Sequence, residues 1–141
     1  MEQWIEFAGN HPLLTSGFVA VLGMLIWGEI SRRTRGFSEL TPAQAIPLIN
    51  HKDTKVIDVS ASADFQKGHI VGARNVLPSR FANPDAEIEK LQGKNVFVVC
   101  KNGQAAPTAA SAIVKLGAAK VAMLKGGMLQ WNADNYPVTR N

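Results

Sequence analysis

A long stretch without charged residues near the N-terminus constrains this chain more than any other feature. Twenty-two residues separate Glu6 from Glu29, and none of them is Asp, Glu, Lys or Arg. As an α-helix rising about 1.5 Å per residue, the stretch covers roughly 33 Å, close to the hydrocarbon thickness of a bilayer. The sequence therefore predicts a transmembrane helix over residues 7–30, preceded by a short tail of residues 1–6 and followed by a basic linker of residues 31–36.

A buried helix, an interfacial helix and a cleaved signal peptide each fit this apolar stretch less well than a membrane span. A buried core helix is rarely so long and so uniformly apolar, and an interfacial helix has a charged face, which is missing here. A cleaved signal peptide needs a basic N-terminal region, whereas residues 1–6 contain Glu2 and Glu6 and no Lys or Arg. Arg32, Arg33 and Arg35 all follow the stretch. Because cytoplasmic flanks collect Lys and Arg, we expect the N-terminus outside and the following domain in the cytoplasm.

The remainder of the chain, residues 37–141, has the composition of one soluble domain. Its basic residues are scattered and show no run or aromatic cluster, which argues against a nucleic-acid partner. Cys100 is the single cysteine of the chain, so an intrachain disulfide and a CxxC metal pair are excluded. The three histidines lack metal-ligand spacing. We therefore expect no metal and no cofactor.

Short apolar runs alternate with helical patterns throughout this domain. Strands are expected at residues 55–59, 74–77, 96–100 and 121–124, and helices at residues 43–50, 62–67, 85–91, 106–116 and 127–133. This alternation predicts an α/β domain with a mainly parallel sheet flanked by helices. The run from Val96 to Cys100 is the most apolar, as expected for a strand covered on both faces.

Cys100 ends that apolar run, and parallel sheets bind ligands at the carboxyl ends of their strands. Five loop residues follow before the next expected helix: Lys101, Asn102, Gly103, Gln104 and Ala105. Gly103 permits a tight turn, main-chain N–H groups in such a loop can converge on an anion, and the helix N-terminus adds partial positive charge. These features favour a nucleophilic thiolate at Cys100. The alternatives are that Cys100 is a small buried hydrophobe and that Lys101 is an ordinary solvated lysine. Asp58, at another strand end, is expected to tie down neighbouring groups.

Three motifs in this order resemble the signatures of rhodanese-like domains. The first runs from Asp58-Val59 through Asp64-Phe65 to the stretch 68–76, the second is Cys100 with its loop, and the third is Leu124-Lys125-Gly126-Gly127 with Trp131. With the N-terminal span, the chain resembles a membrane-anchored, single-domain rhodanese of the bacterial inner membrane. The resemblance implies that Cys100 takes sulfur from thiosulfate or a persulfide, holds it as a persulfide and passes it to a thiol acceptor. The Gly126-Gly127 pair is expected to allow close packing beside the Cys100 loop.

Two positions depart from the pattern of that family. Ala105 stands where many active rhodaneses have an arginine, and Ser60 stands where an arginine often follows the Asp-Val pair. These departures leave a second function open, a non-catalytic rhodanese-like module that binds a protein partner at the inner membrane. A phosphatase or arsenate reductase of the same fold is disfavoured, because that chemistry uses an arginine six positions after the cysteine and Ala106 stands there.

Overall fold

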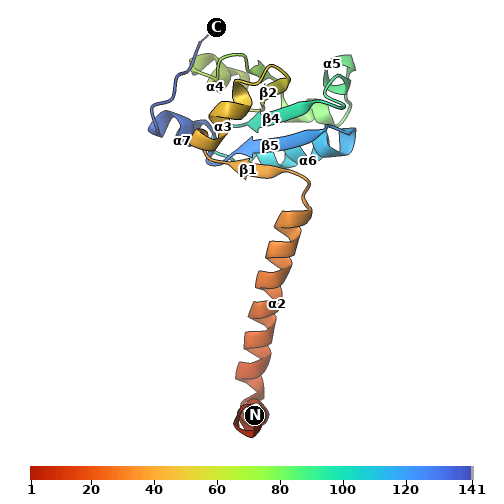
Figure 1. Ribbon diagram of the computed structural model, residues 1–141, viewed down its shortest axis with the longest axis vertical. Helices are drawn as coiled ribbons and strands as arrows, with labels where there is room; N and C mark the ends of the chain where they lie inside the picture. Colours follow the sequence, from red (N-terminus) through yellow and green to blue (C-terminus); the bar gives the residue numbers. More distant parts are fainter. Residues whose placement is uncertain (141) are drawn as a thin grey trace. The chain divides into compact units, whose positions relative to one another are not determined.

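The computed structural model describes residues 1–140, with Arg32 described by its backbone alone. The chain divides into two units, Met1–Arg35 and Gly36–Asn141, and the boundary falls inside the expected basic linker (Figure 1). The first unit consists of helices α1 (Glu2–Asn10) and α2 (Pro12–Thr34).

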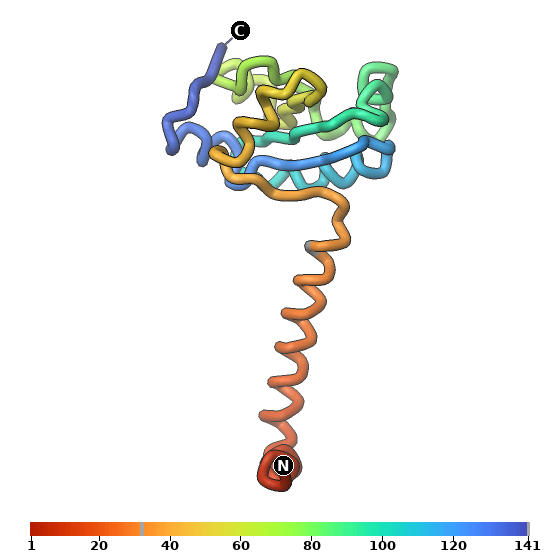
Figure 2. Tube along the Cα trace, viewed as in Figure 1, coloured from red at the N-terminus to blue at the C-terminus, as the bar shows by residue number. Residues whose placement is uncertain are grey.

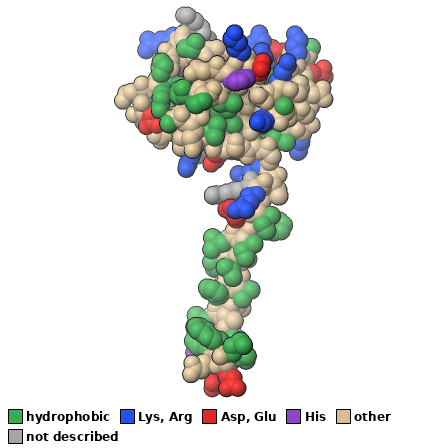
Figure 3. Space-filling view, viewed as in Figure 1, with side chains coloured by type: hydrophobic (Ala, Val, Ile, Leu, Met, Phe, Trp, Pro, Cys, Tyr) green, Lys and Arg blue, Asp and Glu red, His purple; other side chains and the backbone are tan. Residues whose placement is uncertain are grey.

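Helix α2 begins at Pro12, five residues after the start that the sequence predicts. His11 leaves the helical conformation, with φ −130° and ψ 63°, and separates the two helices. Proline suits the first helical position because its missing N–H is not needed there. Within α2, Pro12–Ser31 is long and apolar enough to cross a membrane, by length and composition. Hydrophobic side chains are distributed along this helical unit (Figure 3).

In the described part of the second unit, five strands form one sheet whose neighbouring strands are all parallel. The order along the sheet is β1-β5-β4-β2-β3, so β4 occupies the centre (Figure 1). The strands are β1 (Ser38–Leu40), β2 (Thr54–Asp58), β3 (Arg74–Asn75), β4 (Asn95–Val99) and β5 (Lys120–Leu124). The predicted α/β class with a parallel sheet is therefore confirmed.

The α-helices of this unit lie close to the positions that the sequence predicts, and the short 3-10 helix η1 is an element that the sequence does not predict. They are α3 (Pro42–Ile49), α4 (Ser62–Lys67), η1 (Pro78–Phe81), α5 (Ala86–Glu89), α6 (Ala106–Leu116) and α7 (Gly127–Ala133). Thr41 and Gln44 form a capping box at the start of α3, in which each side chain bonds the other residue's main-chain N–H. Strand β3 is shorter than predicted, because Pro78 begins the 3-10 turn η1 two residues after Val76.

Side chains of the central strands alternate between two hydrophobic cores, as the period of a strand requires. Val98 and Cys100 belong to the core that contains α5 and α6, while Phe97 and Val99 belong to the core that contains α3 and α7. Figure 1 shows α3 and α7 on one side of the sheet and α6 on the other. Strand β4 is therefore covered on both faces, which explains its continuous apolar run.

The C-terminal segment returns to the body of the domain. The N–H of His69 donates to the carbonyl of Thr139 at 2.9 Å, and the N–H of Thr139 donates to the carbonyl of His69 at 2.8 Å. The indole Nε1–H of Trp131 donates to the carbonyl of Pro137 at 3.0 Å. Figure 2 follows the dark blue end of the chain back toward the segment that contains α4. These contacts fix the position of the segment that carries Arg140.

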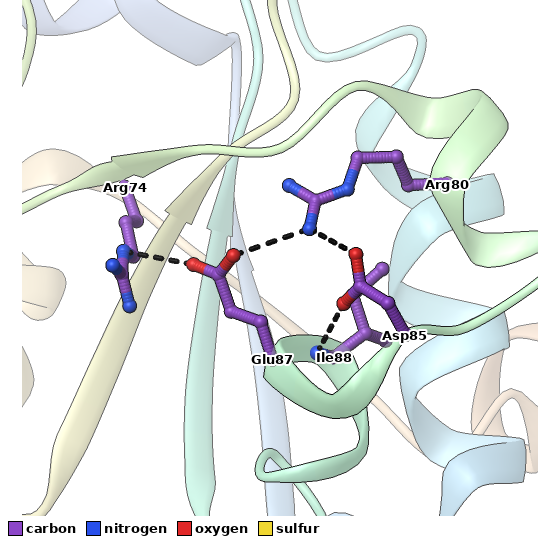
Figure 4. Close-up of polar contacts among 5 residues, drawn as sticks. All are labelled: Arg74, Arg80, Asp85, Glu87 and Ile88. Atoms are coloured by element: carbon purple, nitrogen blue, oxygen red, sulfur yellow. Dashed lines mark hydrogen bonds and ion pairs between the residues drawn. The ribbon is translucent and has the colours of Figure 1, made fainter.

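A charged network joins β3, η1 and α5 (Figure 4). The guanidinium of Arg80 bonds the carboxylates of Asp85 and Glu87, and Glu87 also pairs with Nε of Arg74 at 2.9 Å. Asp85 caps α5 by accepting the N–H of Ile88 at 3.1 Å. The hydrogen bond from Arg80, and after it the one from Ile88, hold the pKa of Asp85 below its ordinary value.

Candidate active site

Cys100 lies directly after β4, at the carboxyl end of the central strand, as the sequence predicts. The strand itself ends one residue earlier than expected, at Val99. Only 1% of Cys100 is exposed, and the residue packs in the same core as Ala106 and Ala109 of α6. The thiol is therefore covered in this structure.

The loop after Cys100 folds back onto its sulfur. The main-chain N–H of Gly103 donates to Cys100 Sγ at 2.9 Å. Gly103 has a φ of 85°, in the left-handed region that side chains disfavour. Asn102 stabilises the turn, because its Oδ1 accepts the N–H of Gln104 at 3.1 Å. The geometry provides an N–H donor that stabilises negative charge on the sulfur.

The β5–α7 connection packs tightly against this loop. The N–H of Met128 donates to the carbonyl of Cys100 at 2.8 Å, and the N–H of Leu129 donates to the carbonyl of Lys101 at 2.9 Å. A Cβ on Gly127 would lie 2.7 Å from the main-chain nitrogens of both Asn102 and Gly103, which leaves no room for a side chain. The expected close packing beside the loop is therefore present, and Gly127 makes it possible.

Asp58 organises the neighbouring strand end. It is 1% exposed, and its Oδ1 accepts hydrogen bonds from the N–H and the hydroxyl of Ser60. Asn75, which was not predicted as a site residue, donates from Nδ2 to the carbonyls of Asp58 and Ser60 at 3.1 and 2.9 Å. The N–H of Val59 bonds the carbonyl of Val99 at 2.8 Å, which fixes this turn beside Cys100. The side chain of Asp58 therefore holds the Ser60 turn in place.

The remaining loop residues lie on the surface. Lys101 places its Nζ 3.7 Å from Oδ1 of Asp64, which is also 3.8 Å from Nζ of Lys67. Gln104 and Ala105 are exposed, and Ala105 immediately precedes α6. The loop thus has a lysine before the turn and no cationic side chain at its junction with α6.

A cavity of about 350 Å³ opens beside the loop. Ser60, Lys101 and Met128 line it. Lys101 follows Cys100, Met128 bonds the Cys100 carbonyl, and Ser60 follows Val59, which bonds the carbonyl of Val99. Lys67 and Arg140 also line it. No motif in the sequence marks these two, because the pairing of His69 with Thr139 brings distant segments together. Within residues 1–140, no group of three or more His, Cys, Asp or Glu side chains is arranged to hold a metal ion.

Comparison with known proteins decides the family. Residues 41–134 match the family model of the Rhodanese-like domain. The chain belongs to the rhodanese-like family. It is 36% identical to the uncharacterized protein YibN of Escherichia coli, over 99% of each chain. It is 30% identical to the thiosulfate sulfurtransferase GlpE of Pseudomonas putida, over 72% of this chain and 89% of that protein.

Solved structures agree with this fold. The crystal structure of a rhodanese-related protein from Thermoplasma volcanium superimposes with a TM-score of 0.65 and 23% identity. The match covers 74% of this chain and 100% of that one. Together with the match of residues 41–134 to the family model, this confirms the rhodanese-like resemblance carried by the sequence motifs.

Proposed function

We propose that this chain is a membrane-anchored sulfurtransferase that carries sulfur as a persulfide on Cys100. The observation that carries the proposal is the N–H of Gly103 directed at Cys100 Sγ, 2.9 Å away, at the carboxyl end of the central parallel strand. The similarity to a thiosulfate sulfurtransferase adds support, since it covers most of the soluble domain.

Loading begins with a thiolate at Cys100. The thiolate attacks the outer sulfur of a donor such as thiosulfate, the S–S bond of the donor breaks, and sulfite leaves with the bonding electron pair. The product is a persulfide anion on Cys100. The N–H of Gly103 and the N-terminal end of α6 favour this negative charge.

Unloading returns the cysteine to its starting state. An acceptor thiolate attacks the outer sulfur of the persulfide, the S–S bond to Cys100 breaks, and the Cys100 thiolate leaves. The acceptor becomes the persulfide, so no external oxidant or reductant is required. Both half-reactions need access to a covered sulfur. The proposal therefore includes opening of the loop formed by residues 101–105.

The anchor and its orientation are part of the proposal. Pro12–Ser31 has the length and hydropathy of a membrane span. The basic residues that follow it favour a cytoplasmic domain. The relative in Escherichia coli aligns along 99% of this chain, so the similarity includes the apolar helix as well as the domain.

A second candidate function is a non-catalytic module that binds a protein partner at the inner membrane. Two observations favour it: Cys100 is covered, and Ala105 and Ser60 leave the loop without the arginines seen in many active rhodaneses. With that function, the cysteine is part of the hydrophobic core.

Mass spectrometry of the full chain in mild detergent separates the two functions. After incubation with thiosulfate or glutathione persulfide, we expect a mass gain of roughly 32 Da, one sulfur atom, on the peptide that contains Cys100. A reducing agent should remove it, and Cys100→Ser should not acquire it. If neither donor modifies the folded protein, the sulfurtransferase proposal fails and the binding module remains.

A further inference from the structure

Three residues that line the cavity adjoin Cys100 or the strand end that carries it. Lys101 follows Cys100, and Met128 in the cavity wall donates its N–H to the Cys100 carbonyl at 2.8 Å. Ser60 also lines the cavity, and it follows Val59, whose N–H donates to the carbonyl of Val99 at the end of β4. A molecule held in this cavity therefore contacts residues that adjoin Cys100, and transfer of sulfur to it requires the loop movement included in the proposed function.

The charged lining of the cavity is predominantly positive. Among the described residues, Lys67, Lys101 and Arg140 contribute cations and Asp64 contributes the carboxylate. Asp64 is shared between the two lysines at 3.7 and 3.8 Å, distances too long for strong hydrogen-bonded pairs. The cavity therefore keeps a positive potential that favours an anionic partner.

Exposed apolar side chains border the same cavity. Leu129 is 58% exposed and Val138 is 41% exposed, and both line it. In the described part of the soluble domain, the other large apolar side chains this exposed are Val71 and Leu77. Exposed apolar side chains beside cations are typical of a contact surface for a partner molecule.

The volume of the cavity suits a partner larger than thiosulfate. About 350 Å³ lies within the range of roughly 300–1,000 Å³ typical of pockets for drug-sized ligands. A five-atom anion such as thiosulfate fills a small part of it and makes no use of Leu129 or Val138. The short side chain of Ser60 contributes to this room, since an arginine there would extend much further from the turn.

We propose that this cavity is the docking site for the sulfur acceptor, and that the acceptor is a protein whose cysteine lies in an acidic segment with an apolar side chain. The acidic groups contact Lys67, Lys101 and Arg140, and the apolar side chain packs against Leu129 and Val138. This inference rests on the proposed function, because it names the class of acceptor that completes the sulfur transfer.

Peptide acceptors of matched sequence test the proposal. The full chain, reconstituted in nanodiscs of neutral phosphatidylcholine, is loaded with persulfide and mixed with one of three short peptides. Each peptide has one Cys and one Leu, flanked by Asp and Glu, by Asn and Gln, or by Lys. The rate of sulfur transfer from the loaded protein to each peptide is divided by the rate at which the same peptide accepts sulfur from glutathione persulfide. This division corrects for differences in thiol reactivity, because flanking charges change the fraction of each peptide's cysteine that is thiolate.

We expect the acidic peptide to accept sulfur about tenfold faster than the neutral one at low salt, and the basic one to be slowest. The preference should weaken at about 0.5 M salt, where charges are screened. Lys67→Glu and Arg140→Glu should each reduce the rate with the acidic peptide several-fold. The rate with the neutral peptide should change less than twofold. Leu129→Ser should slow transfer to the Leu peptide more than transfer to a version with Ser in place of Leu.

Lys94→Glu is the matched control, because Lys94 is exposed in the turn before β4, at the opposite end of that strand from Cys100. Equal rates for the three peptides, or an effect of Lys94→Glu as large as that of Lys67→Glu, overturns the inference. If no persulfide forms at all, the proposed function fails instead. Fluorescence anisotropy with a labelled acidic peptide, Cys replaced by Ser, then still measures docking. Absence of salt-sensitive binding in that assay overturns the docking site independently.

Discussion

Replacing Gly127 by alanine tests the contact between the β5–α7 connection and the Cys100 loop. Gly127 has a φ of 62°, and a left-handed conformation costs a residue with a Cβ about 1–2 kcal/mol. The new methyl group would also lie 2.7 Å from two main-chain nitrogens of the loop. Relieving such an overlap requires a backbone shift that costs about 1–3 kcal/mol. The two effects together predict a loss of about 2–5 kcal/mol of unfolding free energy.

Gly93→Ala separates the two contributions. Gly93 has a φ of 72°, but a Cβ there would meet nothing within 4 Å, so this variant carries only the conformational cost. Pulse proteolysis of the full chain in urea and mild detergent measures both variants under the same conditions. We expect Gly127→Ala to be less stable than Gly93→Ala by at least about 1 kcal/mol. If the two variants agree within about 0.5 kcal/mol, the steric argument for Gly127 is refuted.

Three further predictions concern other parts of the chain. Asp85 has a lowered pKa in the folded state, so its ionised form stabilises the protein above about pH 4 and this contribution is lost as the pH falls through the folded value. The stability difference between wild type and Asp85→Asn should therefore be present at pH 7 and disappear near pH 2 in urea titrations; a constant difference contradicts this. Trp131→Phe removes the hydrogen bond to Pro137. This substitution should lower the unfolding free energy by about 1–3 kcal/mol and accelerate amide exchange at His69. Unchanged exchange at His69 would show that this hydrogen bond does not hold the C-terminal segment in place. A reporter attached after residue 141 that is active only in the periplasm should stay silent, because the arginines follow the span; a signal reverses the proposed orientation.

The sequence predicts most of the domain because its local signals agree with one another. The helical patterns at residues 43–50 and 62–67 and the apolar run before Cys100 each mark an element that the structure contains. Strand β1 escaped prediction because Ser-Glu-Leu has no apolar run and gains its strand character from pairing with β5. The start of α2 differs because counting charges locates an apolar stretch but does not reveal that the backbone breaks at His11.

Part of the candidate site can likewise be predicted from the sequence, and part is visible only in the folded structure. The position of Cys100, its glycine turn and the Gly126-Gly127 pair follow from motifs that are continuous in the sequence. The cavity beside them does not, because Lys67 and Arg140 lie more than seventy residues apart and meet there through the folded chain. The role of Asn75 is also a product of folding, since its amide reaches two carbonyls on the neighbouring strand end.

The return of the C-terminal segment has a practical consequence for anyone who produces this protein. Thr139 is paired with His69, and the next residue, Arg140, lines the cavity beside Cys100. An affinity tag fused after residue 141 would begin close to the paired Thr139, and a polyhistidine or acidic tag would add its own charge beside that cavity. Assays of acceptor preference therefore need a tag at the N-terminal end, or one that a protease removes before measurement.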